Sequence, residues 1–266
     1  MKIISKMSNR PIAFFDSGVG GLTVMSKLRT LLPDEDFLYF GDTIHMPYGE
    51  KSKEELFEFA DDIFKFFISK NAKAVVMACN TTSSLIYDAI KSKYDLKIYP
   101  IIQSVAGILA NLPINTIGIF ATPATVNSNV YKTQINNKNP NINVIQISCA
   151  EWVKIVEENR IYDESSINCI FDKMSVMLKN VPDKIVLGCT HYPYLIDVLS
   201  KYADRNTFID PADYFVQFIK EDLEKSDMLE AAFGKSEIYV SANPELFELS
   251  AKRFLDVSIP IKLIKF

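Results

Sequence analysis

Short apolar runs separated by turn-forming residues recur along the whole chain. An apolar run of four to eight residues bounded by turn formers is typical of a strand buried in a parallel sheet. The runs are residues 11–15, 37–40, 74–78, 116–120, 144–149 and 185–188. They fall into two groups of three, so the pattern predicts two successive sets of parallel strands.

Helical patterns lie between these strands. Residues 22–32 repeat leucine and methionine at spacings of three and four, and Pro33 ends that helix. Ser52 and Glu55 have the spacing of a capping box at the start of another amphipathic helix. Residues 136–143 are rich in asparagine and predict a surface loop.

The two groups of strands repeat each other at a nearly constant distance. Corresponding strand ends are Phe15 and Phe120, Phe40 and Ile147, and Cys79 and Cys189. These pairs lie 105, 107 and 110 residues apart, which indicates a diverged internal repeat. A late strand at residues 238–240 is expected to return to the first group.

The repeat predicts the architecture. We expect an α/β protein of two similar three-layer domains with mainly parallel sheets, related by a pseudo-twofold axis, with the active site in the cleft between them. The first domain would comprise residues 1–98 and 210–266 and carry Cys79. The second would comprise residues 99–209 and carry Cys189.

Composition excludes several classes of function. The 266 residues are 48% hydrophobic, which allows sizeable cores, and the net charge of −4 offers no basic footprint for nucleic acid. No apolar run approaches the length of a membrane span. Four cysteines in a chain of this length do not suggest a disulfide framework, so we expect a cytoplasmic protein with reduced thiols.

Two cysteines stand where chemistry is expected. Cys79 and Cys189 each end a predicted strand, and ligands of open α/β sheets bind at the carboxyl ends of strands. A thiol has an ordinary pKa of about 8.5, so a modest shift makes it a proton donor or acceptor near neutral pH. Two thiols on opposite sides of one bound molecule would remove a proton on one face and return it on the other.

The neighbours of the two thiols fit an amino acid as substrate. Hydroxyl and amide groups can hold carboxylates without a metal. Asp16 could bind an ammonium group or orient one thiol, and His191 lies two residues beyond the other. The remaining candidate ligands are Ser17, Asn80, Thr81, Thr122, Thr125 and Thr190.

Other interpretations remain open from the residues alone. Cys79, Cys189 and His191 could form a three-ligand metal site, although no short metal-binding motif accompanies them. Cys189 could be the nucleophile of a hydrolase or transferase with His191 as its base. A binding module that holds an amino acid without reacting is a third possibility, and a strand-end cysteine can also be simple core packing. His45 receives no role, and Glu157 would by default be a solvated helix residue.

Five segments together resemble the bacterial glutamate racemase family. They are residues 15–24 (FDSGVGGLTV), 39–43 (YFGDT), 47–49 (PYG), 78–81 (ACNT) and 188–193 (GCTHYP), and they follow in order over most of the chain. The related aspartate racemases share the two-cysteine arrangement but usually lack the first and last of these forms. An aspartate or related amino-acid racemase is therefore the alternative.

The resemblance implies an isomerase that needs no cofactor and no metal, interconverts L- and D-glutamate, and supplies D-glutamate for peptidoglycan. It implies Cys79 and Cys189 as the acid/base residues, assisted by Asp16 and His191. It also implies a homodimer, with Asp42 and Glu157 behind the site residues. The substrate site would be lined by Asp16, Ser17, Pro47, Tyr48, Gly49, Asn80, Thr81, Thr190 and His191.

Two segments depart from the family pattern. Ala121 and Ala124 stand where the family has glycine, while Thr122 and Thr125 keep its threonines. Residues 149–157 lack both of the family's prolines, at Ala150 and Lys154, but end in Glu157.

Overall fold

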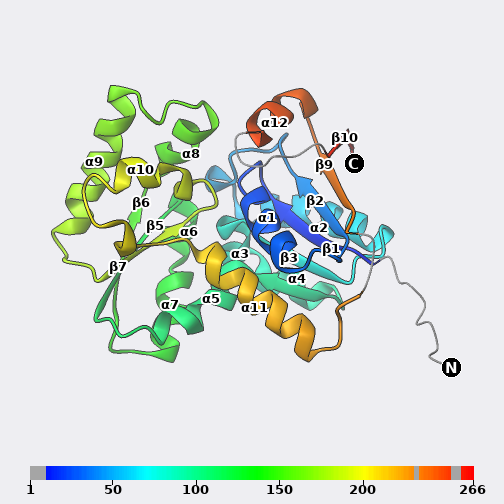
Figure 1. The fold of residues 1–266 in the computed structure, drawn as a ribbon, viewed down its shortest axis with the longest axis horizontal. Coiled ribbons are helices and arrows are strands. Elements are labelled where there is room, and N and C mark those ends of the chain that lie inside the picture. The colour runs from blue at the N-terminus through cyan, green and yellow to red at the C-terminus, as the bar shows by residue number, and fades with distance from the viewer. Residues whose placement is uncertain (1–9, 231–233, 253–258) are drawn as a thin grey trace.

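The computed structural model describes residues 10–230, 234–252 and 259–266, and it contains two parallel sheets that lie side by side (Figure 1). The first sheet has six strands in the order β10-β9-β2-β1-β3-β4, and the second has four in the order β6-β5-β7-β8. Every strand pair in both sheets is parallel. The predicted α/β class with two parallel sheets is confirmed.

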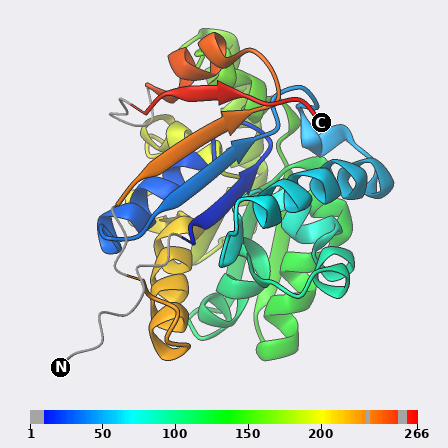
Figure 2. The same cartoon turned by 90° about the vertical axis from the view of Figure 1, so that its right-hand side faces the viewer.

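The first sheet is built from both ends of the described chain. Its strands are β1 (Ile12–Asp16), β2 (Phe37–Gly41), β3 (Ala74–Met77), β4 (Lys97–Pro100), β9 (Ser236–Val240) and β10 (Ile261–Leu263). Its connecting helices are α1 (Leu22–Leu31), η1 (Tyr48–Glu50), α2 (Lys53–Ser69), α3 (Asn80–Leu85) and α4 (Tyr87–Lys93). The orange and red strands β9 and β10 lie beside the blue β2 (Figure 2), so the predicted return of residues 238–240 to the first group is confirmed.

The second sheet is built from the middle of the chain. Its strands are β5 (Thr116–Ala121), β6 (Asn143–Ser148), β7 (Lys184–Gly188) and β8 (Phe208–Ile209). Its helices are α6 (Pro123–Ser128), α7 (Val130–Lys138), α8 (Ala150–Glu157), α9 (Glu164–Leu178), η2 (Tyr192–Leu195), α10 (Ile196–Leu199) and η3 (Arg205–Thr207). Helices α5 (Ile101–Ala110), α11 (Pro211–Lys225) and α12 (Pro244–Ala251) complete the described elements.

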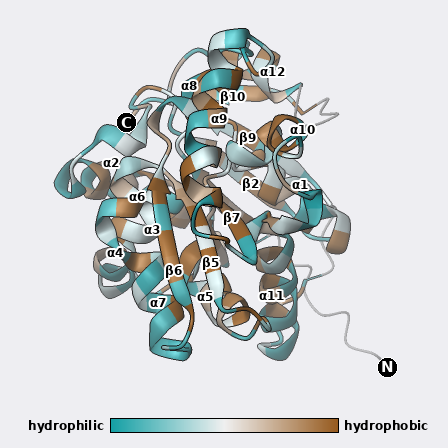
Figure 3. Cartoon of the chain, turned by 90° about the vertical axis from the view of Figure 1, so that its left-hand side faces the viewer, coloured by the Kyte–Doolittle hydropathy of each residue, from teal (hydrophilic) through white to brown (hydrophobic). Residues whose placement is uncertain are grey.

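The central strands of each sheet are buried on both faces. Along β1, Ile12 and Phe14 belong to one hydrophobic cluster, whereas Ala13 and Phe15 belong to the cluster on the opposite face. Strands buried on both sides read as continuous apolar runs, which is the pattern from which the strands were predicted. Figure 3 shows hydrophobic colour on the strands of the second sheet and hydrophilic colour on the outward surfaces of the surrounding helices. Each sheet is therefore the middle layer of three.

The strand order and register reproduce the predicted repeat. Strands β2-β1-β3-β4 and β6-β5-β7-β8 have the same order. Phe15 is paired with Phe40 and Met77 in the first sheet, and Phe120 is paired with Ile147 and Leu187 in the second. The two halves are therefore equivalent position by position at the strand ends.

Two further expectations have different outcomes. The loop predicted at residues 136–143 is wrong at both ends, because α7 continues to Lys138 and β6 begins at Asn143. The division into residues 1–98 with 210–266 and residues 99–209 stays a prediction, and its first boundary falls inside β4. None of the described helices combines the length and apolar composition needed to cross a bilayer.

Candidate active site

The two strand-end cysteines occupy equivalent positions in the two halves. Cys79 stands two residues beyond Met77, and Cys189 stands two residues beyond Leu187. Met77 is paired with Phe15 in the first sheet, and Leu187 is paired with Phe120 in the second. The repeated register thus places each thiol just past the carboxyl edge of its own sheet.

One cavity brings both thiols together. Cys79 and Cys189 line the same pocket, whose volume is about 40 Å³. Both side chains are nearly inaccessible, at 6% and 7% exposure. The other predicted residues that line this pocket are Ser17, Pro47, Tyr48, Gly49, Asn80, Thr81, Thr122, Thr190 and His191. Asp16, Asp42, Thr125 and Glu157 lie behind the lining.

Cys79 sits in the less favourable place for a thiolate. Burial, followed by the charge of Asp16, raises the pKa of the Cys79 thiol to about 12. The backbone N–H groups of Thr82 and Thr81, at the start of α3, act in the opposite direction but do not compensate. At neutral pH and without a ligand, Cys79 is therefore a protonated thiol.

Cys189 has a cationic neighbour. Its sulfur lies 3.7 Å from His191 Nδ1, and His191 Nε2 lies 2.6 Å from Glu157 Oε1. Burial alone would lower the pKa of His191, but Cys189 and Glu157 outweigh it and hold that pKa well above its usual value. The charged imidazole donates toward the sulfur from one nitrogen and to the carboxylate from the other, so a positive charge lies beside the sulfur of Cys189.

Asp16 is held below the cavity. Its carboxylate accepts a hydrogen bond from the Gly18 N–H at 3.0 Å and another from the Thr190 hydroxyl at 3.3 Å. Complete burial raises the pKa of Asp16 to about 6, although the charge of His191 and these donors act against the rise. Asp16 therefore connects the first half of the chain to Thr190 in the second.

The glycine-rich turn after β1 allows this close approach. A Cβ atom added at Gly20 would lie 2.3 Å from Thr190 Oγ1 and 3.1 Å from His191 Cε1. Only a residue without a side chain leaves room for Thr190 and His191 at that point. The turn thus serves packing of the two halves against each other.

Hydroxyl groups from both halves join on the cavity wall. Thr81 Oγ1 and Thr122 Oγ1 are 3.0 Å apart, and the Thr122 hydroxyl donates to Thr125 Oγ1 at 3.0 Å. Thr122 also caps α6 by accepting from the Thr125 N–H, with Pro123 in the first turn. This capped start forms with Ala121 and Ala124 in place of the family's glycines. The altered segment therefore still presents Thr122 to the cavity.

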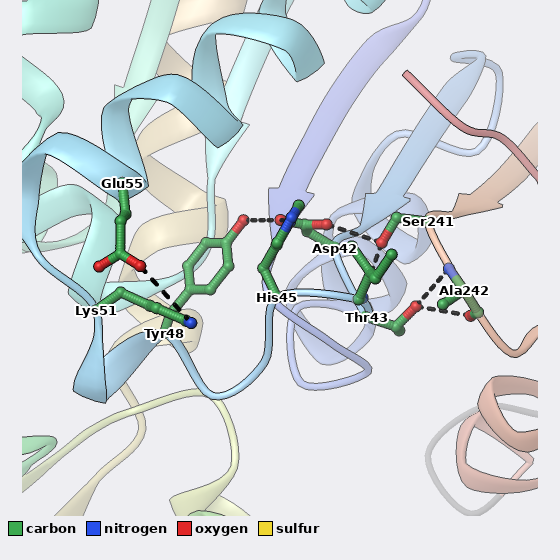
Figure 4. Close-up of polar contacts among 9 residues, drawn as sticks. Asp42, Thr43, His45, Tyr48, Lys51, Glu55, Ser241 and Ala242 are labelled. Atoms are coloured by element: carbon green, nitrogen blue, oxygen red, sulfur yellow. Dashed lines mark hydrogen bonds and ion pairs between the residues drawn. The ribbon is translucent and has the colours of Figure 1, made fainter.

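Asp42 fixes the loop that forms another wall (Figure 4). Its carboxylate accepts hydrogen bonds from the Tyr48 and Ser241 hydroxyls and lies 2.8 Å from His45 Nδ1. Burial, with the charge of Asp42, raises the pKa of Tyr48 well above its usual value, so its hydroxyl stays protonated and donates. Asp42 therefore acts from behind the cavity through Tyr48.

Six lining residues were not predicted from the sequence. They are Met46, Glu50, Pro123, Ala150, Val153 and Lys154. Three of them come from α8, whose inward face follows from the helical spacing of residues 150, 153 and 154 once the helix is placed. His45, which received no role, is stacked on Phe59 at a ring separation of 3.7 Å.

A metal site in this cavity would need at least three ligating side chains around one ion. No three histidine, cysteine, aspartate or glutamate side chains among the described residues are arranged to hold a metal ion. Cys79, Cys189 and His191 line one cavity without forming such a group.

Residues 22–219 match the family described as Asp/Glu/Hydantoin racemase. The chain belongs to this racemase family. Glutamate racemase 2 of Caldanaerobacter subterraneus subsp. tengcongensis is 39% identical over 257 residues, which cover 95% of this chain and 96% of the relative. The matched segment contains both cysteines, His191 and Glu157.

Solved racemase structures have the same fold. Glutamate racemase from Francisella tularensis, in complex with D-glutamate, superimposes with a TM-score of 0.90 at 33% identity, covering 97% of this chain and 98% of the other. Glutamate racemase isoform RacE1 from Bacillus anthracis gives a TM-score of 0.91 at 26% identity with the same coverage. The two-sheet architecture is therefore that of the glutamate racemases.

The charge of His191 in this racemase is expected to depend on Glu157. Glu157→Gln removes the carboxylate that holds the imidazolium, so the pKa of His191 should fall toward its ordinary value of about 6.5. The chain has two histidines, so His45→Gln leaves a single imidazole whose titration can be followed by NMR without ambiguity. The Glu157→Gln change is made in that background.

Glu158→Gln provides the matched control. Glu158 is the next residue, but its carboxylate accepts from Arg160 at 2.6 Å. The control should leave the His191 titration unchanged. Equal titration in the Glu157 and Glu158 variants would show that the 2.6 Å contact does not set the charge of the imidazole.

Proposed function

We propose that this chain interconverts L-glutamate and D-glutamate by moving the α-proton between the substrate and two thiols, Cys79 and Cys189. One observation carries the proposal: two cysteines at register-equivalent strand ends line a single cavity. The relative solved with D-glutamate supports the choice of substrate over aspartate. A nucleophilic Cys189 or a passive binding module would leave Cys79 without a function.

The proton transfers balance within the pair. A thiolate on one face takes the α-proton and becomes a thiol, which leaves a carbanion at Cα. The thiol on the other face gives its proton to that carbon and becomes a thiolate. The configuration is inverted, and the two cysteines have exchanged protonation states.

The raised pKa of Cys79 supports a role for this residue as the proton donor at the start of the reaction. Cys79, with its raised pKa, begins as the thiol, so the proposal assigns the first proton abstraction to Cys189, beside the His191 imidazolium. His191 would assist proton transfer at Cys189, and Glu157 would keep the imidazole charged and oriented. Asp16 would be a positioning residue that holds Thr190 at the cavity.

The polar lining supplies part of the acidification of the α-carbon. Negative charge moves onto the α-carboxylate as the proton leaves, so donors aimed at that carboxylate stabilise the carbanion. Each such donor is worth about 3–4 kcal/mol by analogy with oxyanion sites. The residues proposed to donate to that carboxylate are Ser17, Asn80, Thr81, Thr122 and Thr190, while Pro47, Tyr48 and Gly49 close the other wall. The Thr122 and Thr190 hydroxyls donate to Thr125 and Asp16 in the structure and would turn to the substrate when it binds.

The setting proposed for the enzyme follows from its chemistry. D-glutamate is a component required for peptidoglycan, so the activity would feed cell-wall synthesis. The mechanism needs free thiols, which fits a reducing cytoplasm, and all four cysteines are free in the structure. We also propose that the chain assembles as a homodimer, as its relatives often do.

The activity is tested directly by following pure L-glutamate in D₂O. Circular dichroism should decay to zero while NMR shows one deuterium entering at Cα per inversion, without pyridoxal phosphate and in the presence of EDTA. Tight binding without loss of optical activity would instead identify a binding module. Loss of activity on adding EDTA would support the metal interpretation. Faster turnover of aspartate than of glutamate would overturn the substrate assignment.

A further inference from the structure

Two opposite charges face each other at the rim of the cavity. Glu50 lies in η1, in the part of the chain that forms the first sheet, and Lys154 lies in α8, which belongs to the second. Both line the reaction cavity. Among the described lining residues, these two are the acidic and basic side chains besides His191.

The ammonium group of Lys154 lies near two carboxylates but forms a close contact with neither. Lys154 Nζ lies 3.8 Å from Glu50 Oε1 and 3.9 Å from Glu151 Oε1. Both distances exceed those of a hydrogen bond, and exposed pairs of this kind contribute little stability. The lysine therefore loses little when it exchanges one anionic partner for another.

Glu50 and Lys154 lie at the solvent-exposed end of the cavity. The Lys154 side chain is 47% exposed and that of Glu50 is 62% exposed, whereas the two thiols below them are almost fully buried. Residues 46–50 and three residues of α8 line the cavity, and the two segments approach each other at Glu50 and Lys154. A molecule that enters between these segments passes the ammonium group before it reaches the cysteines.

We propose that Lys154 guides and positions the anionic substrate at this entrance, by exchanging Glu50 for a carboxylate of the incoming amino acid. The inference rests on the proposed function for the identity of that amino acid. A dicarboxylic amino acid carries two negative charges and one positive charge, so Lys154 attracts it and Glu50 repels it. The flexible four-carbon stem lets Nζ follow the carboxylate inward. Lys154 is thus a positioning residue that selects for an anionic substrate.

Substitution at Lys154 tests the proposal through the salt dependence of kcat/KM. Lys154→Gln should lower kcat/KM for L-glutamate about three- to tenfold at low ionic strength, mainly through KM, with kcat within about twofold. The difference should shrink as NaCl rises, because salt screens charges over about 10 Å at 0.1 M. Lys154→Arg keeps the charge and should restore most of the loss. Lys132→Gln, an exposed lysine of α7 outside the cavity, is the matched control for net charge.

Substitution at Glu50 has the opposite expected sign. Glu50→Gln should raise kcat/KM for L-glutamate at low salt, because it removes the repelling charge and releases Lys154. A loss in Glu50→Gln like that in Lys154→Gln would mean that the pair only clasps the two segments, and would overturn the proposal. A Lys154→Gln effect that equals the Lys132→Gln effect, or that persists unchanged in high salt, would overturn it as well.

Calorimetric binding of L-glutamate separates this inference from the proposed function. Affinity should fall in Lys154→Gln with the same salt dependence as KM, and this measurement needs no turnover. If the wild-type chain binds glutamate more tightly than Lys154→Gln but does not racemise it, the proposed function is wrong and the role of Lys154 in binding is supported. If the chain racemises glutamate and Lys154→Gln binds it with unchanged affinity, the proposed function is supported and the role of Lys154 is wrong.

Discussion

Replacing either Cys79 or Cys189 by alanine is expected to lower glutamate racemisation by at least about a thousandfold in both directions. Each thiol serves one face of the substrate, and both faces are needed for inversion. Water in the space left by the sulfur is a much weaker base than a thiolate, so it does not replace the missing group. Circular dichroism of L- and D-glutamate solutions measures both directions with one assay.

The two variants should also differ from each other. The remaining thiol can still remove and return a proton on its own face, so each variant should slowly exchange the α-hydrogen of one enantiomer with D₂O. The favoured enantiomer should be opposite for Cys79→Ala and Cys189→Ala. Cys169→Ala, a half-buried thiol outside the cavity, is the control and should stay fully active. Racemisation retained in either cavity variant would remove that cysteine from the mechanism.

Asp16→Asn is expected to stabilise the fold while lowering activity about a hundredfold. Burial raises the pKa of Asp16 from 3.8 to about 6. At about 1.4 kcal/mol for each tenfold change in protonation, the ionised carboxylate costs the folded state about 3 kcal/mol at neutral pH. Asparagine removes this cost, but it also removes the charge that faces His191 and one acceptor for Gly18 and Thr190.

The pH dependence of this stabilisation has a definite sign. The folded-state pKa lies above the unfolded one, so the protonated carboxyl favours the fold below about pH 4, and this contribution is lost as the pH rises through about 6. The gain in melting temperature of Asp16→Asn should therefore be largest above pH 6 and vanish near pH 4. Asp172→Asn, on the exposed side of α9, controls for loss of a carboxylate. A gain that is independent of pH would refute burial of the charge as its cause.

The strand ends could be predicted because the central strands of the sheets are buried on both faces. Continuous apolar runs identify such strands, and turn residues after Phe15, Met77 and Leu187 mark the edge where a site forms. The equal spacing of the cysteines then placed both thiols in one cleft. Helix α9 was not predicted, although Ile170, Met174 and Met177 have helical spacing and are all buried.

Contacts between segments far apart in the sequence could not be derived from local pattern. Glu157 reaches His191 over 34 positions in sequence, and Thr190 reaches Asp16 over 174. The first contact depends on how α8 packs beside the turn after β7, and the second depends on how the two sheets are oriented. Hydrophobic periodicity encodes neither. The resemblance to a known family supplied Glu157 as a candidate, whereas Lys154 departs from the family pattern and so emerged from the structure alone.

Strands β9 and β10, which complete the first sheet beside β2, are the last strands of that sheet to be synthesised. Strand β2 has its outer edge covered by β9, and Ser241, just after β9, donates to Asp42 behind Tyr48. As a ribosome extends the chain, that edge stays open until residues 236–240 have emerged, although both cysteines are already made. An open parallel edge is a template for aggregation. Until residues 236–240 have emerged, the nascent chain therefore exposes a strand edge, and the cavity wall behind Tyr48 gains its support only when Ser241 follows.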